Sequence, residues 1–390
     1  MADQHIGTFK NYVGGQWLNS NSGNTYEITS PASKDTVLGA FQTSGIDDVS
    51  QAVDAAYLAL PSWAETPAPA RAHILYKALE VMNRRSEELA RTITIEEGKP
   101  ISDARGEVRR AMNIIEYAAG EGRRMFGYTT PSELPNTMAY TVRRPLGVVA
   151  LITPWNFPIA IPAWKLAPAL ICGNTVVFKP ASATPLSAVK LVEVFEEAGL
   201  PPGVFNLITG PGSSVGNALV ENPKVTGISF TGSTEIGTDI YTAGAKLLKK
   251  VQCEMGGKNA VILLSDADLD KALGGIVQGA FGSTGQRCTA TSRAIVEEGI
   301  YTDFLGQLID RTSRLKIGDG LDPDVDVSPL SSQYQLDKVM EYIGIGTEEG
   351  ANLAYGGHVL SDGDYSKGYY IEPTIFTDVT PDMRIAKEEI

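Results

Sequence analysis

The chain has 390 residues, of which 43% are hydrophobic and 20% are charged, and its formal net charge is −13. This length is typical of two or three domains, and the composition supports a large buried core rather than a disordered chain. The acidic balance disfavours a nucleic-acid partner, because such proteins present basic surfaces to phosphates. The three cysteines indicate neither a disulfide framework nor a metal site, and they favour a reducing compartment, the cytoplasm.

The first third of the sequence predicts a hairpin followed by amphipathic helices. NYVGGQW places Gly-Gly between aromatic and β-branched residues, which is typical of a hairpin turn. Apolar stripes with helical spacing predict helices over 47–60, 74–97 and 103–122. The next stretch, GYTTPSELPNTMAYTVRRPLG, predicts an exposed two-stranded excursion.

From residue 147 the pattern changes to alternating strands and helices. Strands are predicted over 147–152, 175–180, 204–210 and 225–232, with helices over 163–171, 186–199 and 214–222. This alternation indicates a parallel α/β sheet, and a second alternating section begins near residue 260. The uncharged run over 145–164 is long enough to cross a membrane, but its four prolines favour a buried strand and loop, so we expect no membrane partner.

Two glycine-rich turns follow predicted strands, GPGSSVG from Gly210 and GSTEIG from Gly232. Both place backbone amides where a helix begins, which suits a pyrophosphate, but neither is the dinucleotide fingerprint, so ordinary tight turns stay an equal alternative. Lys179 ends a predicted strand, where open α/β sheets bind ligands, although a surface lysine is the commoner role for this residue type.

Three polar side chains are candidates for catalysis. Glu254 stands before two glycines in EMGGK and suits a general base, although a surface glutamate is the plain alternative. Asn156 lies between two prolines in PWNFP, a rigid mount for an amide donor or simply a turn asparagine. Cys288 follows Gly-Gln-Arg in an open, polar setting, and an adjacent cation or helix N-terminus would lower its thiol pKa, whereas most isolated cysteines are inert core residues. The chain's three histidines are poorly placed as its base, which disfavours a cysteine–histidine hydrolase.

The chain resembles the aldehyde dehydrogenase superfamily in six motifs that occur in the family's order: WNFP, KPAS, FTGSTEIG, EMGGK, GQRC and KEEI. The resemblance implies an α/β fold with a Rossmann-like NAD(P)-binding domain over 1–121 and 145–256. It also implies an oligomerisation β-hairpin over 122–144 and a second α/β catalytic domain over 257–390. Homodimers or homotetramers are typical of the family. Family members continue past KEEI, so the resemblance predicts either a fragment or a shortened form with an incomplete catalytic domain.

The resemblance also assigns roles to residues. Cys288 is implied to attack the aldehyde, which gives a thiohemiacetal and, after hydride transfer to the nicotinamide, a thioester. Glu254 is implied to act as base, Asn156 and the Cys288 amide to form the oxyanion hole, and Lys165 to join their network. No metal is implied. The residues implied to bind the cofactor are Ile152, Thr153, Pro154, Trp155, Lys179, Ser182, Gly212, Gly216, Phe230, Gly232, Ser233, Met255, Gly256 and Glu389.

The cofactor and substrate expectations rest on finer similarities. Many NAD-preferring relatives carry an acidic residue at the position of Ser182, so we expect NADP to be preferred over NAD. The wording of the motifs is most similar to bacterial 2,5-dioxopentanoate (α-ketoglutaric semialdehyde) dehydrogenases, with other aliphatic or aromatic aldehydes as alternatives. The expected substrate contacts are Phe157, Ile161, Trp164, Arg287 and Thr289, with Arg109 a further candidate for a substrate carboxylate. Two alternatives would not be aldehyde dehydrogenases: a thiol esterase that needs no cofactor, and an inactive scaffold.

Overall fold

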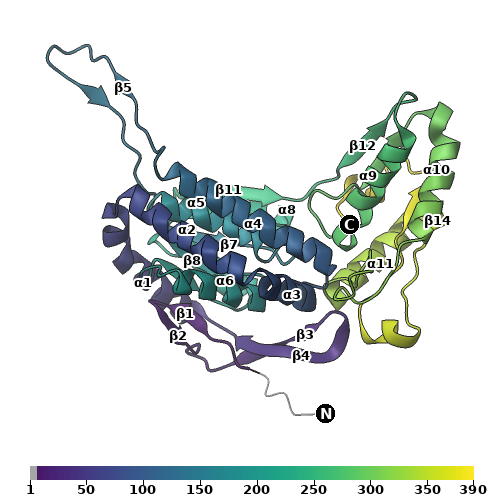
Figure 1. Ribbon diagram of the computed structural model, residues 1–390, viewed down its shortest axis with the longest axis horizontal. Coiled ribbons are helices and arrows are strands. Elements are labelled where there is room, and N and C mark those ends of the chain that lie inside the picture. Colours follow the sequence, from purple (N-terminus) through teal and green to yellow (C-terminus); the bar gives the residue numbers. More distant parts are fainter. Residues whose placement is uncertain (1–6) are drawn as a thin grey trace. The chain divides into compact units, whose positions relative to one another are not determined.

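The computed structural model describes residues 7–390, which fold into two compact units (Figure 1). Unit 1 comprises residues 7–27, Gly39–Leu89 and Glu107–Glu254. Unit 2 comprises Ile28–Leu38, Ala90–Gly106 and Met255–Ile390. Two short N-terminal stretches thus group with the C-terminal third of the chain. None of the helices among residues 7–390 is both long enough and apolar enough to cross a membrane.

A seven-stranded sheet forms the centre of unit 1, in the order β11-β10-β7-β8-β9-β1-β2. Strands β10, β7, β8 and β9 are parallel, while β1 pairs antiparallel with β9 and β2. The parallel α/β sheet predicted from the sequence is confirmed. Its strands are β1 (Asn11–Val13), β2 (Gln16–Leu18), β7 (Val148–Ile152), β8 (Thr175–Lys179), β9 (Phe205–Leu207), β10 (Val225–Gly232) and β11 (Lys250–Met255).

The two innermost parallel strands explain why the sequence predicts this sheet so well. Every residue of β7 (VVALI) and β8 (TVVFK) is buried, because helices pack on both faces of the sheet. Strands buried on both faces need continuous apolar runs rather than alternation, and this is the pattern that the sequence shows.

The strand order creates a switch point in this sheet. The chain runs from β7 outward to β8 and β9, and then returns to β10 on the opposite side of β7. In open α/β sheets ligands bind beyond the carboxyl ends of the strands at such a reversal. The edge where β7, β8 and β10 end is therefore the first place to look for a site in unit 1.

The helices over the first two-thirds of the chain follow the predicted stripes, with one difference. The expected helix over 74–97 is broken at Arg85 (φ −99°, ψ 12°), which separates α2 from α3. Helices α3 and α4 contribute residues to both units. The helices are α1 (Ile46–Glu65), α2 (Ala68–Arg84), α3 (Ser86–Glu97), α4 (Ile101–Glu121), α5 (Ala160–Ile171), α6 (Pro185–Glu197), α7 (Asn217–Glu221) and α8 (Thr234–Lys246).

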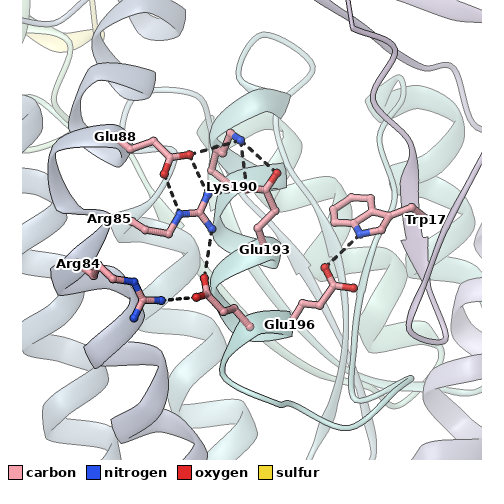
Figure 2. A network of polar contacts seen from close by, with 8 residues as sticks. Trp17, Arg84, Arg85, Glu88, Lys190, Glu193 and Glu196 are labelled. Atoms are coloured by element: carbon pink, nitrogen blue, oxygen red, sulfur yellow. Dashed lines mark hydrogen bonds and ion pairs between the residues drawn. The ribbon is translucent and has the colours of Figure 1, made fainter.

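A charged network surrounds the break at Arg85 (Figure 2). The Arg85 guanidinium donates two hydrogen bonds to Glu88, both 2.8 Å long, and a third, of 2.5 Å, to Glu193 on α6. Lys190 lies between the same two carboxylates, 3.4 Å from Glu88 and 3.1 Å from Glu193. The network therefore ties the start of α3 to α6 at the point where the helix is interrupted.

Two further pairs of strands occur in the N-terminal half. Strands β3 (Thr25–Ser30) and β4 (Ser33–Gln42) form one two-stranded sheet. Strands β5 (Thr129–Thr130) and β6 (Ala139–Tyr140) pair antiparallel in the predicted excursion, which projects away from the helices of unit 1 (Figure 1).

Unit 2 contains the second α/β section. Strands β12 (Ala260–Leu263) and β13 (Arg293–Val296) pair in parallel, and β14 (Asn352–Tyr355) pairs antiparallel with β15 (Ile375–Thr377). A core that includes Leu273, Phe304 and Leu308 packs against them. The helices of this section are α9 (Leu269–Phe281), α10 (Glu298–Ser313), α11 (Gln333–Glu348) and α12 (Arg384–Lys387).

Candidate active site

The carboxyl ends of three strands bring several predicted cofactor residues together in unit 1. In the sheet register Ile152 pairs with Lys179 on one side and with Phe230 on the other. Thr153 continues this pairing, because its amide donates to the Lys179 carbonyl at 3.2 Å. Pro154 and Trp155 follow directly, half-buried. The expected residues thus converge at the switch point.

Lys179 is buried at this edge with little to neutralise its charge. It is 5% exposed, and its Nζ donates to the Pro180 carbonyl at 2.9 Å. Burial lowers the pKa of Lys179 to about 8. A buried cation near a carbonyl rather than a carboxylate suits a ligand with hydroxyl or phosphate oxygens, so this residue fits a nucleotide cofactor.

The two glycine turns differ in what they offer a phosphate. Gly212–Gly216 forms a π-helical turn that leads into α7, a helix of only five residues. Helix α8 is longer and begins after Ser233, whose hydroxyl accepts a hydrogen bond from the Ile236 amide at 3.4 Å. Gly232 and Ser233 thus stand where β10 ends and a 13-residue helix begins, the arrangement that favours an anion.

Ser182 lies near the first of these turns. Its hydroxyl donates to the Gly210 carbonyl at 3.0 Å, which ties the residues after β8 to the turn after β9. Because this residue is a serine, it brings no carboxylate to the end of β8.

The loop that carries Asn156 is anchored by a carboxylate on α4. Glu107 is 2% exposed, and its Oε1 accepts hydrogen bonds from the amides of Ile159 (2.9 Å) and Ala160 (3.0 Å). These amides belong to the start of α5, whose first N–H groups have no partner within the helix. Glu107 therefore caps α5 and fixes the end of the PWNFP loop.

Lys165 and Glu254 form an ion pair in unit 1. Lys165 is 6% exposed on α5, and its Nζ lies 3.4 Å from Glu254 Oε2 on β11. The same ammonium donates to Ser229 Oγ at 3.0 Å and Gln252 Oε1 at 3.3 Å. Burial lowers the pKa of Lys165, and the nearby carboxylate opposes that shift.

Glu254 is held in its ionised form by its neighbours. Burial works to raise the pKa of this carboxyl, but the Lys165 charge and a 3.0 Å hydrogen bond from Thr231 Oγ1 outweigh it, so the pKa lies below its usual range. The side chain is 46% exposed, so water reaches the carboxylate. An ionised, hydrated carboxylate can take a proton, as a general base must.

Cys288 lies in unit 2 at the end of an unusual turn. Ser283 (φ 51°), Thr284 (φ 56°) and Gly285 (φ 68°) are consecutive left-handed residues, a conformation that costs roughly 1–2 kcal/mol for each residue with a Cβ. Beyond the turn, Asn259 Nδ2 donates to the Cys288 carbonyl at 2.9 Å and to the Ala290 carbonyl at 3.1 Å. The Cys288 side chain is half-buried.

Glu389 and Gly256 are close neighbours in unit 2. A Cβ added to Gly256 would overlap the Glu389 carboxylate. The observed position of Glu389 therefore requires glycine at residue 256. Met255, the remaining expected cofactor residue, is exposed at the end of β11.

The expected substrate contacts are placed in different surroundings. Phe157 and Trp164 are half-buried in unit 1, and Arg110 lies over the Trp164 ring, 5.5 Å from its centroid. Ile161 is fully buried, Thr289 is exposed, and the Arg287 guanidinium is hydrogen-bonded within its own turn.

Sequence reasoning missed the residues that support these groups. Glu107, Thr231 and Asp103 were not singled out, because an acidic residue in an amphipathic helix or a threonine in a strand looks ordinary. Only the contacts in the fold distinguish them. The spacing of Asp103 and Glu107, four apart on α4, was the one available hint.

Comparison with known proteins identifies the family to which the chain belongs. Residues 17–390 match the aldehyde dehydrogenase family. The chain is 47% identical to the α-ketoglutaric semialdehyde dehydrogenase of Bacillus subtilis, with 98% of this chain and 78% of the relative aligned. It is 46% identical to the 2,5-dioxopentanoate dehydrogenase of Saccharolobus solfataricus, over 98% and 79%. A crystal structure of an NADP-dependent enzyme from E. coli superposes with a TM-score of 0.93 at 41% identity, covering 99% of this chain and 79% of the other.

These matches confirm the predicted fold and the predicted class of enzyme. The chain belongs to the aldehyde dehydrogenase family, oxidoreductases that act on aldehyde groups with a nicotinamide cofactor.

Proposed function

We propose that the chain oxidises a carboxylate-bearing semialdehyde, such as 2,5-dioxopentanoate, to the acid through a Cys288 thioester. The observation that carries the substrate is the 46–47% identity, over nearly the whole chain, to relatives named for this semialdehyde. The fold, the ion pair of Lys165 with Glu254 and the anchored Asn156 loop support the chemistry.

The proposed reaction begins at the thiolate of Cys288, which attacks the aldehyde carbon and forms a thiohemiacetal. Negative charge then develops on the aldehyde oxygen, where the Asn156 amide and the Cys288 N–H donate. A donor fixed at such an oxygen is worth about 3–4 kcal/mol. Lys179, Gly232 and Ser233 would hold the nicotinamide cofactor, which would supply the acceptor for the hydride that leaves this carbon as the thioester forms.

Glu254 is the proposed base for the second half. Its carboxylate takes a proton from a water, the water attacks the thioester carbon, and the carbon–sulfur bond breaks to release the acid and the thiol. Lys165 favours this role because its charge keeps Glu254 ionised. Cys288 supplies a leaving group, so no metal is required for either step.

The proposed cofactor is NADP in preference to NAD. The buried Lys179 can pair with a 2′-phosphate, and Ser182 brings no carboxylate to repel it. The E. coli neighbour described as NADP-dependent supports the same choice. The other proposed cofactor contacts are the residues of the β7 and β10 ends, the two glycine turns, Gly256 and Glu389. Phe157, Ile161, Trp164, Arg287 and Thr289 are proposed to contact substrate.

The excursion around β5 and β6 is proposed to mediate self-association. Aromatic and aliphatic side chains on it are exposed, among them Phe126 (71%), Tyr128 (74%) and Met138 (78%). Exposed apolar side chains on a projecting hairpin suit burial against a second copy. Sedimentation of the chain beside a variant with these three residues changed to serine tests this. The variant should sediment as a smaller species, and the proposed role of the excursion fails if both sediment alike.

The function is tested by steady-state kinetics on matched aldehydes. We expect 2,5-dioxopentanoate to give a higher kcat/KM than the neutral aldehyde of the same chain length, and NADP to give a higher kcat/KM than NAD. A preference for the neutral aldehyde would overturn the substrate, and a large preference for NAD would overturn the cofactor. Ester hydrolysis without cofactor, in the absence of aldehyde oxidation, would favour the thiol esterase instead.

A further inference from the structure

The left-handed turn before Cys288 is the feature that requires explanation. Ser283 and Thr284 both adopt backbone angles that residues with a Cβ disfavour, and Gly285 continues the turn three positions before the nucleophile. Such a backbone persists only where surrounding contacts hold it, and it often occurs at functional sites. The contacts that hold this turn therefore also fix the backbone that leads to Cys288.

One carboxylate oxygen makes three of these contacts. Asp103 Oδ2, in the first turn of α4, accepts a 2.7 Å hydrogen bond from the Ser283 amide and a 3.0 Å bond from the Ser283 hydroxyl. It also lies 3.3 Å from Arg287 Nη2. The Asp103 and Arg287 side chains are only 21% and 23% exposed, and Ser283 is 2% exposed.

Arg287 closes the same cluster from the other end of the turn. Its Nε and Nη2 donate to Ser283 Oγ at 3.1 and 2.9 Å. Ser283 Oγ thus accepts from the arginine while it donates to the aspartate, and the arginine is the residue next to Cys288. The cluster therefore spans the turn from its first left-handed residue to the neighbour of the nucleophile.

A second set of contacts holds the middle of the turn. Thr284 Oγ1 lies 3.0 Å from both the carbonyl and the hydroxyl of Ser328, and Gln286 Oε1 accepts from the Ser331 amide at 3.1 Å. These are neutral bonds, whereas the Asp103 cluster is charge-assisted and the stronger of the two.

We propose that Asp103 is a positioning residue for the nucleophile: by binding Ser283 and Arg287, it maintains the left-handed turn that presents Cys288 to the aldehyde. This rests on the proposed role of Cys288. It assigns Asp103 a function that its place in an amphipathic helix did not suggest, and it gives Arg287 a structural role in the turn in addition to any contact with substrate.

The test removes the Asp103 carboxylate in one variant and the backbone strain at Ser283 in another. The variants are Asp103→Ala, Ser283→Gly and the two combined, with saturating cofactor and aldehyde. Because a small displacement of a reacting group lowers the rate steeply, Asp103→Ala should lower kcat roughly 10- to 100-fold and change KM little. Glycine adopts the left-handed conformation without support, so in the Ser283→Gly background the same change should lower kcat less than about threefold.

Hydrogen exchange of residues 281–291 measures the stability of the turn independently of activity. The Ser283 amide donates to Asp103, so its exchange should accelerate in Asp103→Ala, while exchange in 298–313 stays unchanged. If Asp103→Ala does not fold, Asp103→Asn, which keeps one acceptor oxygen but loses the charge, supplies the comparison with a smaller effect. Asp270→Ala is the matched control, because it removes an exposed aspartate–arginine pair in the same unit and should leave both readouts unchanged.

Two results would overturn the proposal. One is unchanged exchange of the turn in Asp103→Ala, and the other is a loss of kcat from Asp103→Ala that is equal in the parent chain and in the Ser283→Gly background. Failure of the proposed function would give a different experimental result. If Cys288→Ala keeps aldehyde oxidation, the role of the cysteine fails, while the exchange experiment still reports whether Asp103 holds the turn.

Discussion

Lys165 Nζ lies 3.4 Å from Glu254 Oε2, and this pair joins a buried ammonium on α5 to a half-exposed carboxylate on β11. The ammonium stabilises the ionised carboxylate, and the carboxylate partly offsets the cost of burying the ammonium. The pair therefore sets the pH range in which Glu254 can accept a proton.

Lys165→Met should move the acidic limb of the kcat profile to higher pH. The Lys165 charge holds the pKa of Glu254 below its usual range, so its loss raises that pKa. A base is active above its pKa and is lost as pH falls through it, which means that the variant loses activity at a pH where the parent still works. A pH–rate profile measures this, with Lys190→Met as control because Lys190 pairs with other carboxylates. An unshifted limb would show that another group limits the rate.

The preference for NADP should decline above a pH of about 8, where burial places the pKa of Lys179. Below that pH the ammonium is charged and attracts a 2′-phosphate, and above it the neutral amine does not. The ratio of kcat/KM for NADP to that for NAD should fall with rising pH, up to about tenfold per unit. This ratio cancels the ionisation of groups that act with both cofactors. Lys179→Met should give a low, pH-independent ratio, and a parent ratio that stays flat across this range would contradict the role of Lys179.

Glu107→Ala should weaken catalysis through the loop that carries Asn156. The change leaves the buried amides of Ile159 and Ala160 without their acceptor, which costs about 1–3 kcal/mol for each unpaired group. We expect kcat and the melting temperature both to fall. Glu107→Gln keeps an acceptor oxygen and should restore most of both. Glu116→Ala, an exposed change on the same helix, is the control, and an equal effect of the two alanine variants would exclude a specific role for the cap.

Arg85→Met should destabilise the protein more than Arg84→Met. Arg85 is 17% exposed and pairs with three carboxylates, those of Glu88, Glu193 and, at 3.9 Å, Glu197. Arg84 is 60% exposed and pairs with Glu197. Loss of a partly buried charged network should lower the free energy of unfolding by about 1–2 kcal/mol, and loss of the exposed pair by less than about 0.5 kcal/mol. Urea unfolding of both variants measures the difference. Equal values would show that the network adds nothing beyond an ordinary surface pair.

The sequence predicts the central sheet well because its strands carry their own pattern. β7 and β8 are continuous apolar runs, and the residues at their carboxyl ends, among them Thr153 and Lys179, are therefore placed at one edge by the register alone. The Gly14-Gly15 turn is equally readable, because both residues adopt positive φ angles that favour glycine.

The supporting residues were beyond prediction because their importance arises from tertiary contacts. Asp103 and Glu107 look like members of a solvated helix face, yet each accepts backbone amides from a distant loop. The break at Arg85 is hidden for the same reason: the local sequence continues a helical stripe, and the ion pairs with Glu193 on α6 come from a segment about 108 residues away.

The central claim, oxidation of a semialdehyde through a thioester on Cys288, is tested most directly by mixing the enzyme rapidly with 2,5-dioxopentanoate and NADP. The proposed mechanism predicts a burst of reduced cofactor stoichiometric with the chain in a Glu254→Gln variant, where release of the thioester is slow. It also predicts an acyl group on Cys288 in the peptide that spans 281–291. Cys288→Ala should show neither. Steady production of reduced cofactor by Cys288→Ala, or acylation at Cys172 or Cys253 in place of Cys288, would contradict the account.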